Sequence, residues 1–173
     1  AGGADVLVLC DTNGGCLSHE VYDITKLVTQ KFNISVGAHT HNDSETGVAN
    51  AMEAVRAGAI QVQGTINGFG ERCGNCNLIS VIANIIKKTD QTCLADPEQL
   101  KNLKLVSQFI NEQANLRDNQ RAAYVGDSAF AHKAGMHVDG VRKAVSSFEH
   151  VSPDDVGNNR RILISELSGA SNV

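Results

Sequence analysis

The stretch Ile34–Asp43, ISVGAHTHND, runs from apolar residues directly into a polar turn and ends with the pair His39 and His41. Side chains two residues apart in a β-strand point to the same face, so both imidazoles would be directed at one point. Imidazole nitrogens bind Zn, Mn, Fe, Co or Ni, and added oxygen ligands favour a harder ion such as Mn or Mg. The pattern therefore predicts a divalent-metal site; the alternative is two polar strand-end residues that hydrogen-bond to their neighbours.

A second segment, Gly64–Asn75 (GTINGFGERCGN), follows another apolar run. Its glycine density suits tight turns with positive φ and a close approach of the backbone to a ligand. The amide oxygen of Asn75 could complete the coordination of a metal, or Asn75 could only cap the helix predicted to follow it. Glu71 and Arg72 lie within the turn, where we expect salt bridges that hold the loop.

Polar residues follow three apolar strands, and each strand precedes an amphipathic helix. Continuous apolar strands that alternate with helices predict parallel pairing, either in a doubly wound sheet or in part of an eight-stranded barrel. Both architectures place the chemistry at the carboxyl ends of the strands. Ser18 and Ser44 are the expected N-caps of the first two helices. The predicted strands are Val6–Asp11, Ile34–Thr40 and Ile60–Thr65, and the predicted helices are Ser18–Lys31, Ser44–Ala57 and Asn77–Lys88.

The pattern changes after residue 90, where no further strand is predicted to alternate with helices. One helix is expected from Pro97 to about Leu116, and Ala122–Val145 is expected to contain another that carries His132 and His137. A short apolar run covers Ile162–Leu167. We therefore predict a barrel-like domain at residues 1–90 and a small, mainly helical subdomain at residues 91–173.

The composition is that of an ordinary globular protein, with 173 residues, 42% hydrophobic residues and a net charge of -4. It lacks the basic surface that nucleic acid or an anionic membrane would require. No apolar run approaches the roughly 20 residues that cross a bilayer. We expect a cytoplasmic protein whose five cysteines are reduced thiols, with a zinc knuckle at Cys73 and Cys76 as the less favoured alternative.

Several motifs together resemble one enzyme family, the 2-isopropylmalate, homocitrate and citramalate synthases. These acetyl-CoA-dependent Claisen-condensing enzymes are built on a (β/α)₈ barrel. The resemblance implies an α/β fold class: the C-terminal three βα units of a (β/α)₈ TIM barrel, followed by the helical linker subdomain. Asn158–Arg161 and Ser165–Gly169 are most similar to the citramalate branch. The motifs shared with the whole family are DTNG at 11–14, HTHND at 39–43, Gly64–Asn75, FAHKAGMHVDG at 130–140 and SPDDVG at 152–157.

The resemblance also implies roles for individual residues. His39, His41 and Asn75 would bind a divalent metal (Mn, Mg, Zn or Co), completed by an aspartate from a first barrel strand that this chain does not contain. Thr12 would contact the 2-keto acid. His137 would reach into the active site of the partner subunit in a homodimer and assist proton transfer or thioester hydrolysis.

The implied reaction is the metal-dependent condensation of acetyl-CoA, as co-substrate, with a 2-keto acid, pyruvate, to give citramalate. The alternatives are 2-isopropylmalate or homocitrate synthesis, a related carbon–carbon lyase, and a noncatalytic dimerisation fragment. Phe148 stands where relatives have a tyrosine, so any role of that hydroxyl is lost or taken over. Without the other barrel strands we expect the isolated chain to be inactive.

Overall fold

The computed structural model describes residues 2–163 and divides the chain into two compact units, Ala1–Ile85 and Ile86–Val173. The first unit contains strand–helix repeats, as the sequence predicts. The second is mainly helical. Among the described residues, no helix is long and apolar enough to span a membrane.

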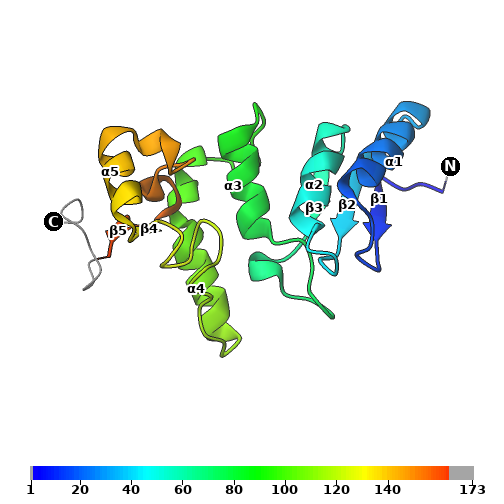
Figure 1. The fold of residues 1–173 in the computed structure, drawn as a ribbon. Coiled ribbons are helices and arrows are strands. Elements are labelled where there is room, and N and C mark those ends of the chain that lie inside the picture. Colours follow the sequence, from blue (N-terminus) through cyan, green and yellow to red (C-terminus); the bar gives the residue numbers. More distant parts are fainter. Residues whose placement is uncertain (1, 164–173) are drawn as a thin grey trace. The chain divides into compact units, whose positions relative to one another are not determined.

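The first unit is built on a parallel sheet in the order β1-β2-β3. Figure 1 shows the strands side by side, next to the helices α1 and α2 that connect them. The register aligns Cys10 with His39 and His39 with Gln63. The strands are β1 (Val6–Asp11), β2 (Ser35–Thr40) and β3 (Gln61–Gln63), and the helices are α1 (Ser18–Lys31), α2 (Gly47–Arg56) and α3 (Leu78–Lys88).

Alternation along β2 assigns its two faces. Val36, Ala38 and Thr40 are buried, and Ala38 belongs to a core cluster that includes Ala54 of α2. These small side chains let the helix approach the sheet closely. His39 lies on the opposite face, because successive side chains of a strand alternate.

The N-caps differ from those predicted. Leu17 precedes α1, and its backbone N–H donates to the Glu20 carboxylate at 2.8 Å. Ser18 instead donates to the Asn50 side chain. Thr46 precedes α2, and the side-chain oxygen of Asn42 accepts from Gly47 N. The predictions of Ser18 and Ser44 as caps were therefore wrong, because carboxylate and amide acceptors nearby take that role.

The second unit includes the last residues of α3, and the next element is a 3₁₀ segment, η2 (Pro97–Asn102). Its last described element is a short strand that pairs in parallel with an earlier one. His132 belongs to that earlier strand and not to the helix predicted for Ala122–Val145. The last residues of the predicted apolar run, 164–167, lie outside the described part. The remaining elements are α4 (Leu103–Gln113), β4 (Ala131–His132), α5 (Gly135–Lys143), η3 (Val145–Ser147), η4 (Pro153–Val156) and β5 (Arg161–Ile162).

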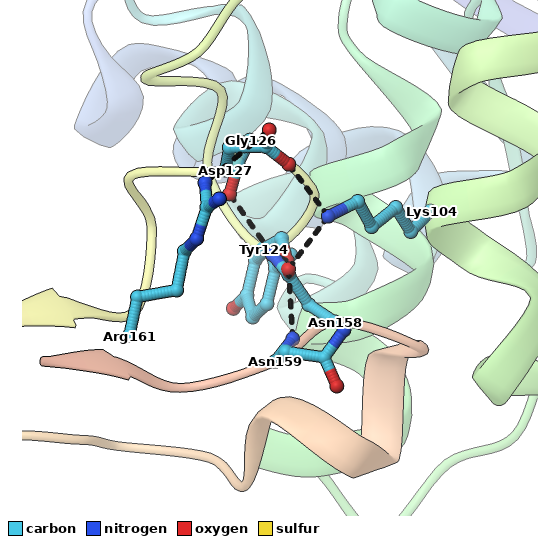
Figure 2. A network of polar contacts seen from close by, with 7 residues as sticks. All are labelled: Lys104, Tyr124, Gly126, Asp127, Asn158, Asn159 and Arg161. Atoms are coloured by element: carbon cyan, nitrogen blue, oxygen red, sulfur yellow. Dashed lines mark hydrogen bonds and ion pairs between the residues drawn. The ribbon is translucent and has the colours of Figure 1, made fainter.

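A buried amide, Asn158, joins three segments of the second unit (Figure 2). Its Nδ2 donates to the carbonyls of Tyr124 and Gly126, each at 2.9 Å. Its Oδ1 accepts from Lys104 Nζ and from the backbone N of Asn159, also at 2.9 Å. All the hydrogen-bonding groups of this side chain are therefore used, which makes burial of the amide favourable.

We expect Asn158→Ala to lower the free energy of unfolding by about 2–4 kcal/mol, because buried carbonyls and the Lys104 ammonium lose a partner. Urea denaturation followed by circular dichroism measures the change. Asn159→Ala is the matched control. Asn159 is exposed and contributes only its backbone N–H to the network, and alanine keeps that group. The change in the free energy of unfolding should therefore stay within about 0.5 kcal/mol. Equal effects of the two substitutions would contradict this role of Asn158.

Candidate metal centre at the strand ends

The polar segments that follow the strands meet at one edge of the sheet, because parallel strands end on the same side. His41, one residue beyond β2, forms an isolated antiparallel bridge with Asn75. Two flanking backbone hydrogen bonds support it: Cys76 N donates to Thr40 O at 2.8 Å, and Asn42 N donates to Gly74 O at 2.9 Å. The glycine-rich segment is thus attached to the end of the strand that carries the histidines.

The two histidines face each other at this edge. His39 Nε2 and His41 Nε2 are 3.3 Å apart, with ring centroids 5.1 Å apart and ring planes at 64°. Nitrogens that each lie about 2.1 Å from one ion are separated by about 3.0 Å at a right angle and about 3.4 Å at a tetrahedral angle. The observed separation therefore fits two nitrogen ligands of one ion, and it equally fits a hydrogen bond between the two rings.

Asn75, which is bridged to His41 through the backbone, carries an amide side chain with a fixed orientation. Its Nδ2 donates to Phe69 O at 3.0 Å, which fixes the orientation of the amide. Asn75 Oδ1 and His41 Nδ1 are buried atoms without a hydrogen-bond partner among the described residues. A buried acceptor without a donor costs about 1–3 kcal/mol, so the unpaired Asn75 oxygen fits a position that a cation occupies.

The protein groups offered by the described residues do not complete such a site. No cluster of three or more His, Cys, Asp or Glu side chains suited to a metal occurs in that part of the chain. The donor set is two imidazoles and one amide, which suits a divalent ion that takes further oxygen ligands from elsewhere. The residues present therefore fit a metal, and they leave its identity open.

Glycines shape the loop that presents Asn75. Gly68 and Gly74 have φ values of 73° and 87°, in the left-handed region. A Cβ on Gly74 would lie 1.9 Å from Gly68 O. This close approach lets Asn75 N donate to the same carbonyl at 3.1 Å. The glycine density in the sequence thus serves the close packing of the loop on itself.

Arg72 ties the three strand-end segments together. Its guanidinium makes two hydrogen bonds to Asp43, Nε to Oδ1 at 2.8 Å and Nη2 to Oδ2 at 3.1 Å, and Nη2 also donates to Thr12 O at 2.8 Å. Arg72 therefore contacts the segments that follow β1 and β2 from the segment that follows β3. The expected salt bridge is confirmed for Arg72, and it lowers the pKa of the Asp43 carboxyl.

The other candidate residues differ in their surroundings. Asp11 is buried and accepts from Cys16 N at 3.4 Å and from Asn50 Nδ2 at 3.5 Å, so it stabilises the turn after β1 and joins that turn to α2. Thr12 is exposed at the end of β1. His137 lies on α5 in the second unit, exposed, with its ring centroid 4.9 Å from that of Phe148.

Sequence reasoning missed the neighbours of His39 across the sheet. The register places Cys10 and Gln63 on either side of it, and laterally aligned residues of a parallel sheet share a face. Period-two alternation indicates the face of each residue within its own strand. Only the register between strands shows which residues are level with the histidine, and no local pattern specifies that register here.

Comparisons with known proteins agree with the strand–helix fold of the first unit. The family model described as HMGL-like matches residues 1–110, and the one described as homocitrate synthase post-HMGL domain-like matches residues 124–173. The chain belongs to the HMGL-like family. The HMG-CoA lyase of Bacillus subtilis shares the fold, with a TM-score of 0.57 and 21% identity over 66% of this chain and 39% of that one. The predicted fold class, βα units of a TIM barrel followed by a mainly helical subdomain, is confirmed.

The curated relatives include condensing synthases. The (R)-citramalate synthase of Sulfolobus acidocaldarius is 54% identical over 99% of this chain and 33% of its own length. That of Geobacter sulfurreducens is 51% identical over 98% and 32%. The 2-isopropylmalate synthase of Methanocaldococcus jannaschii is 32% identical over 96% and 32%. The chain thus spans about a third of the length of these relatives.

We expect the Asp43 carboxyl to titrate below its ordinary value of about 3.9, because Arg72 stabilises the charged form. With the folded pKa below the unfolded one, the stabilisation by this ion pair is present at neutral pH. It is lost as the pH falls through the folded pKa. Carboxyl ¹³C NMR of the full chain measures the midpoint, and Arg72→Gln should raise it.

Arg56→Gln is the control for this titration. Arg56 forms an exposed ion pair with Glu53 on α2, away from the loop, so its loss should leave the Asp43 midpoint in place. An Asp43 midpoint that does not change in Arg72→Gln would show that the guanidinium does not hold this carboxylate in solution.

Proposed function

We propose that this chain is the metal-holding part of an acetyl-CoA-dependent acyltransferase that condenses acetyl-CoA with pyruvate to form citramalate and hydrolyses the thioester. The observation that carries this proposal is at the carboxyl ends of parallel strands. There the Nε2 atoms of His39 and His41 lie 3.3 Å apart, and His41 is bridged through the backbone to Asn75, whose buried amide oxygen is unpaired. The identities with the (R)-citramalate synthases, 54% and 51%, support citramalate as the product. A protein named as a probable 2-isopropylmalate synthase and a 2-isopropylmalate synthase are 36% and 32% identical, below these two values.

His39, His41 and Asn75 are the metal ligands in this proposal, and Mn, Mg, Zn or Co all suit them. A bound divalent ion supplies Lewis-acid polarisation of a carbonyl and stabilisation of the alkoxide formed upon attack. The chain's own contribution is to fix the ligands before a substrate arrives. The Asn75 amide is oriented by Phe69 O, and the two rings are held on and just beyond one strand, so little reorganisation is required.

Thr12 is the proposed contact for the 2-keto acid, with its hydroxyl donating a hydrogen bond to the substrate. Its backbone carbonyl accepts from Arg72 at 2.8 Å, which restrains the residue on the same loop cluster as the ligands. A substrate held by both Thr12 and the metal would have a fixed carbonyl orientation, and orientation is a large part of the rate enhancement in such condensations.

His137 is the proposed catalytic residue of the second unit, where it would transfer a proton or assist thioester hydrolysis. Its ring is exposed, as a group that meets substrate must be. In this proposal residues 1–90 belong to the catalytic barrel and residues 91–173 to the linker subdomain. The intact protein is a homodimer in this proposal, and the linker subdomain that carries His137 completes the active site of the partner subunit.

Homocitrate synthesis is the second candidate, because the family model that matches residues 124–173 takes its description from a homocitrate synthase. The two reactions use different 2-keto acids and the same metal chemistry. A site selective for pyruvate must exclude 2-oxoglutarate, the longer, dicarboxylic 2-keto acid. Comparison of pyruvate with 2-oxoglutarate as added ligand therefore separates the two candidates.

Electron paramagnetic resonance during a Mn²⁺ titration of the full chain tests the metal-binding proposal. We expect saturable binding that weakens at least about tenfold in His39→Ala and in Asn75→Ala, since each loses one ligand. Addition of pyruvate should change the spectrum of the bound ion. The matched control is His19→Ala, which removes an exposed histidine of α1 and should bind as the parent chain does.

Circular dichroism of each variant confirms that the fold is retained. Equal Mn²⁺ affinity of His39→Ala, Asn75→Ala and the parent chain would contradict the metal assignment. A spectrum that responds to 2-oxoglutarate and not to pyruvate would favour homocitrate synthesis over citramalate synthesis.

A further inference from the structure

A buried carboxylate in the second unit has no role in the chemistry described so far. The side chain of Glu149 is only 2% exposed. Its Oε1 lies 2.9 Å from His132 Nε2 and accepts from Arg160 Nε at 2.8 Å, and its Oε2 accepts from Arg160 Nη2 at 2.6 Å. The two hydrogen bonds from one guanidinium hold the carboxylate in a fixed orientation. The neighbouring Arg160 lowers the pKa of Glu149, which keeps it charged at neutral pH.

Stability alone does not account for this cluster. Removing a carboxylate from water costs several kcal/mol, and a buried ion pair contributes little net free energy compared with apolar residues of the same size. What such a cluster provides is a fixed geometry. The three partners come from β4, from the residues after η3 and from the residue that precedes β5, so the cluster anchors the segment that contains Glu149.

The residue next to Glu149 in the chain is packed against His137. The ring centroids of Phe148 and His137 are 4.9 Å apart, at an interplanar angle of 46°. Phe148 also lies over Gly140, where an added Cβ would come within 2.1 Å of Phe148 Cε2. The ring therefore occupies space on α5 that only a glycine leaves free, on the same helix as His137.

These contacts form a continuous path from the carboxylate to the imidazole. The backbone N–H groups of Phe148 and Glu149 both donate to Val145 O, at 3.0 and 2.9 Å. The two residues thus form a single turn. Restraint of the Glu149 side chain by His132 and Arg160 therefore restrains the backbone that carries the Phe148 ring.

We propose that Glu149 is a positioning residue: held by His132 and Arg160, it keeps the Phe148 ring against His137 and so sets the direction of the His137 imidazole. The importance of that direction for catalysis rests on the proposed function. The geometric part concerns only the second unit and stands independently of metal binding by the first. Gly140 contributes to the same positioning, because its lack of a side chain leaves room for the Phe148 ring.

NMR of the full chain, with the His137 ring resonances as the readout, tests this proposal. An aromatic ring at this distance displaces the resonances of the imidazole protons, and Phe148→Leu defines their positions without the ring. We expect Glu149→Gln to move the His137 resonances most of the way to the Phe148→Leu positions. Gly140→Ala should move them in the same direction, because it displaces the ring and leaves the ion cluster intact.

The matched control is Asp127→Asn. Asp127 pairs with Lys104 and with Arg161 rather than with the Glu149 cluster, so its substitution should perturb stability without moving the His137 resonances. If Glu149→Gln does not fold, Arg160→Gln takes its place: this variant removes a partly exposed partner and leaves His132 on the carboxylate. His137 resonances that stay in place in Glu149→Gln or its substitute, or that move equally in Asp127→Asn, would overturn the proposal.

The test is separate from that of the proposed function. Failure of Mn²⁺ to bind the chain would contradict the metal assignment while leaving the His137 resonances of every variant as expected here. Conversely, unchanged His137 resonances in Glu149→Gln would reject the positioning role without affecting metal binding by His39, His41 and Asn75.

Discussion

The backbone pairing between the glycine-rich segment and the end of β2 is the interaction on which the candidate metal centre depends. Thr40 O accepts from Cys76 N, and Asn42 N donates to Gly74 O. These bonds place Asn75 opposite His41. The pairing requires a loop so tight that position 74 accepts no side chain. Backbone geometry, rather than an ion pair, thus brings Asn75 to the strand end that carries the two imidazoles.

The two units use polar side chains in different ways. In the first, Arg72 joins three loops through a partly exposed ion pair with Asp43. Such a pair adds little free energy of folding but restrains the relative positions of the loops. In the second unit, Asn158 and Glu149 are buried and must be fully paired, because an unsatisfied buried amide or carboxylate is costly. Loss of a partner there should affect folding or local geometry strongly.

The sequence predicts where the first two strands end because the alternation of strands, turns and helices is a local pattern. β1 has the predicted bounds, Val6–Asp11, and His39 and His41 lie at the end of a parallel strand. β3 is shorter than predicted, Gln61–Gln63, because Thr65 leaves the sheet to pair with Asn77 and its neighbours. The alternation of residue types marks where a strand lies, but not where its hydrogen bonding changes partner.

The interactions that escaped prediction join residues distant in sequence. His132 lies in a short strand because its backbone pairs with β5. Its side chain pairs with Glu149, and Arg160 binds the same carboxylate. Nothing in the local pattern around His132 specifies these partners, so the sequence alone predicts one helix that carries both His132 and His137. The pairing of Asp43 with Arg72 and the hydrogen bonds of the buried Asn158 amide likewise depend on how separate loops meet in space.

Anomalous X-ray diffraction from crystals of this chain grown with Mn²⁺ tests most directly whether the strand ends form one metal centre. We expect a single strong anomalous peak bonded to His39, His41 and Asn75, with Asn75 Oδ1 directed at the ion and Nδ2 still donating to Phe69 O. A peak at other residues, or His39 and His41 hydrogen-bonded to protein groups with no ion between them, would contradict the assignment.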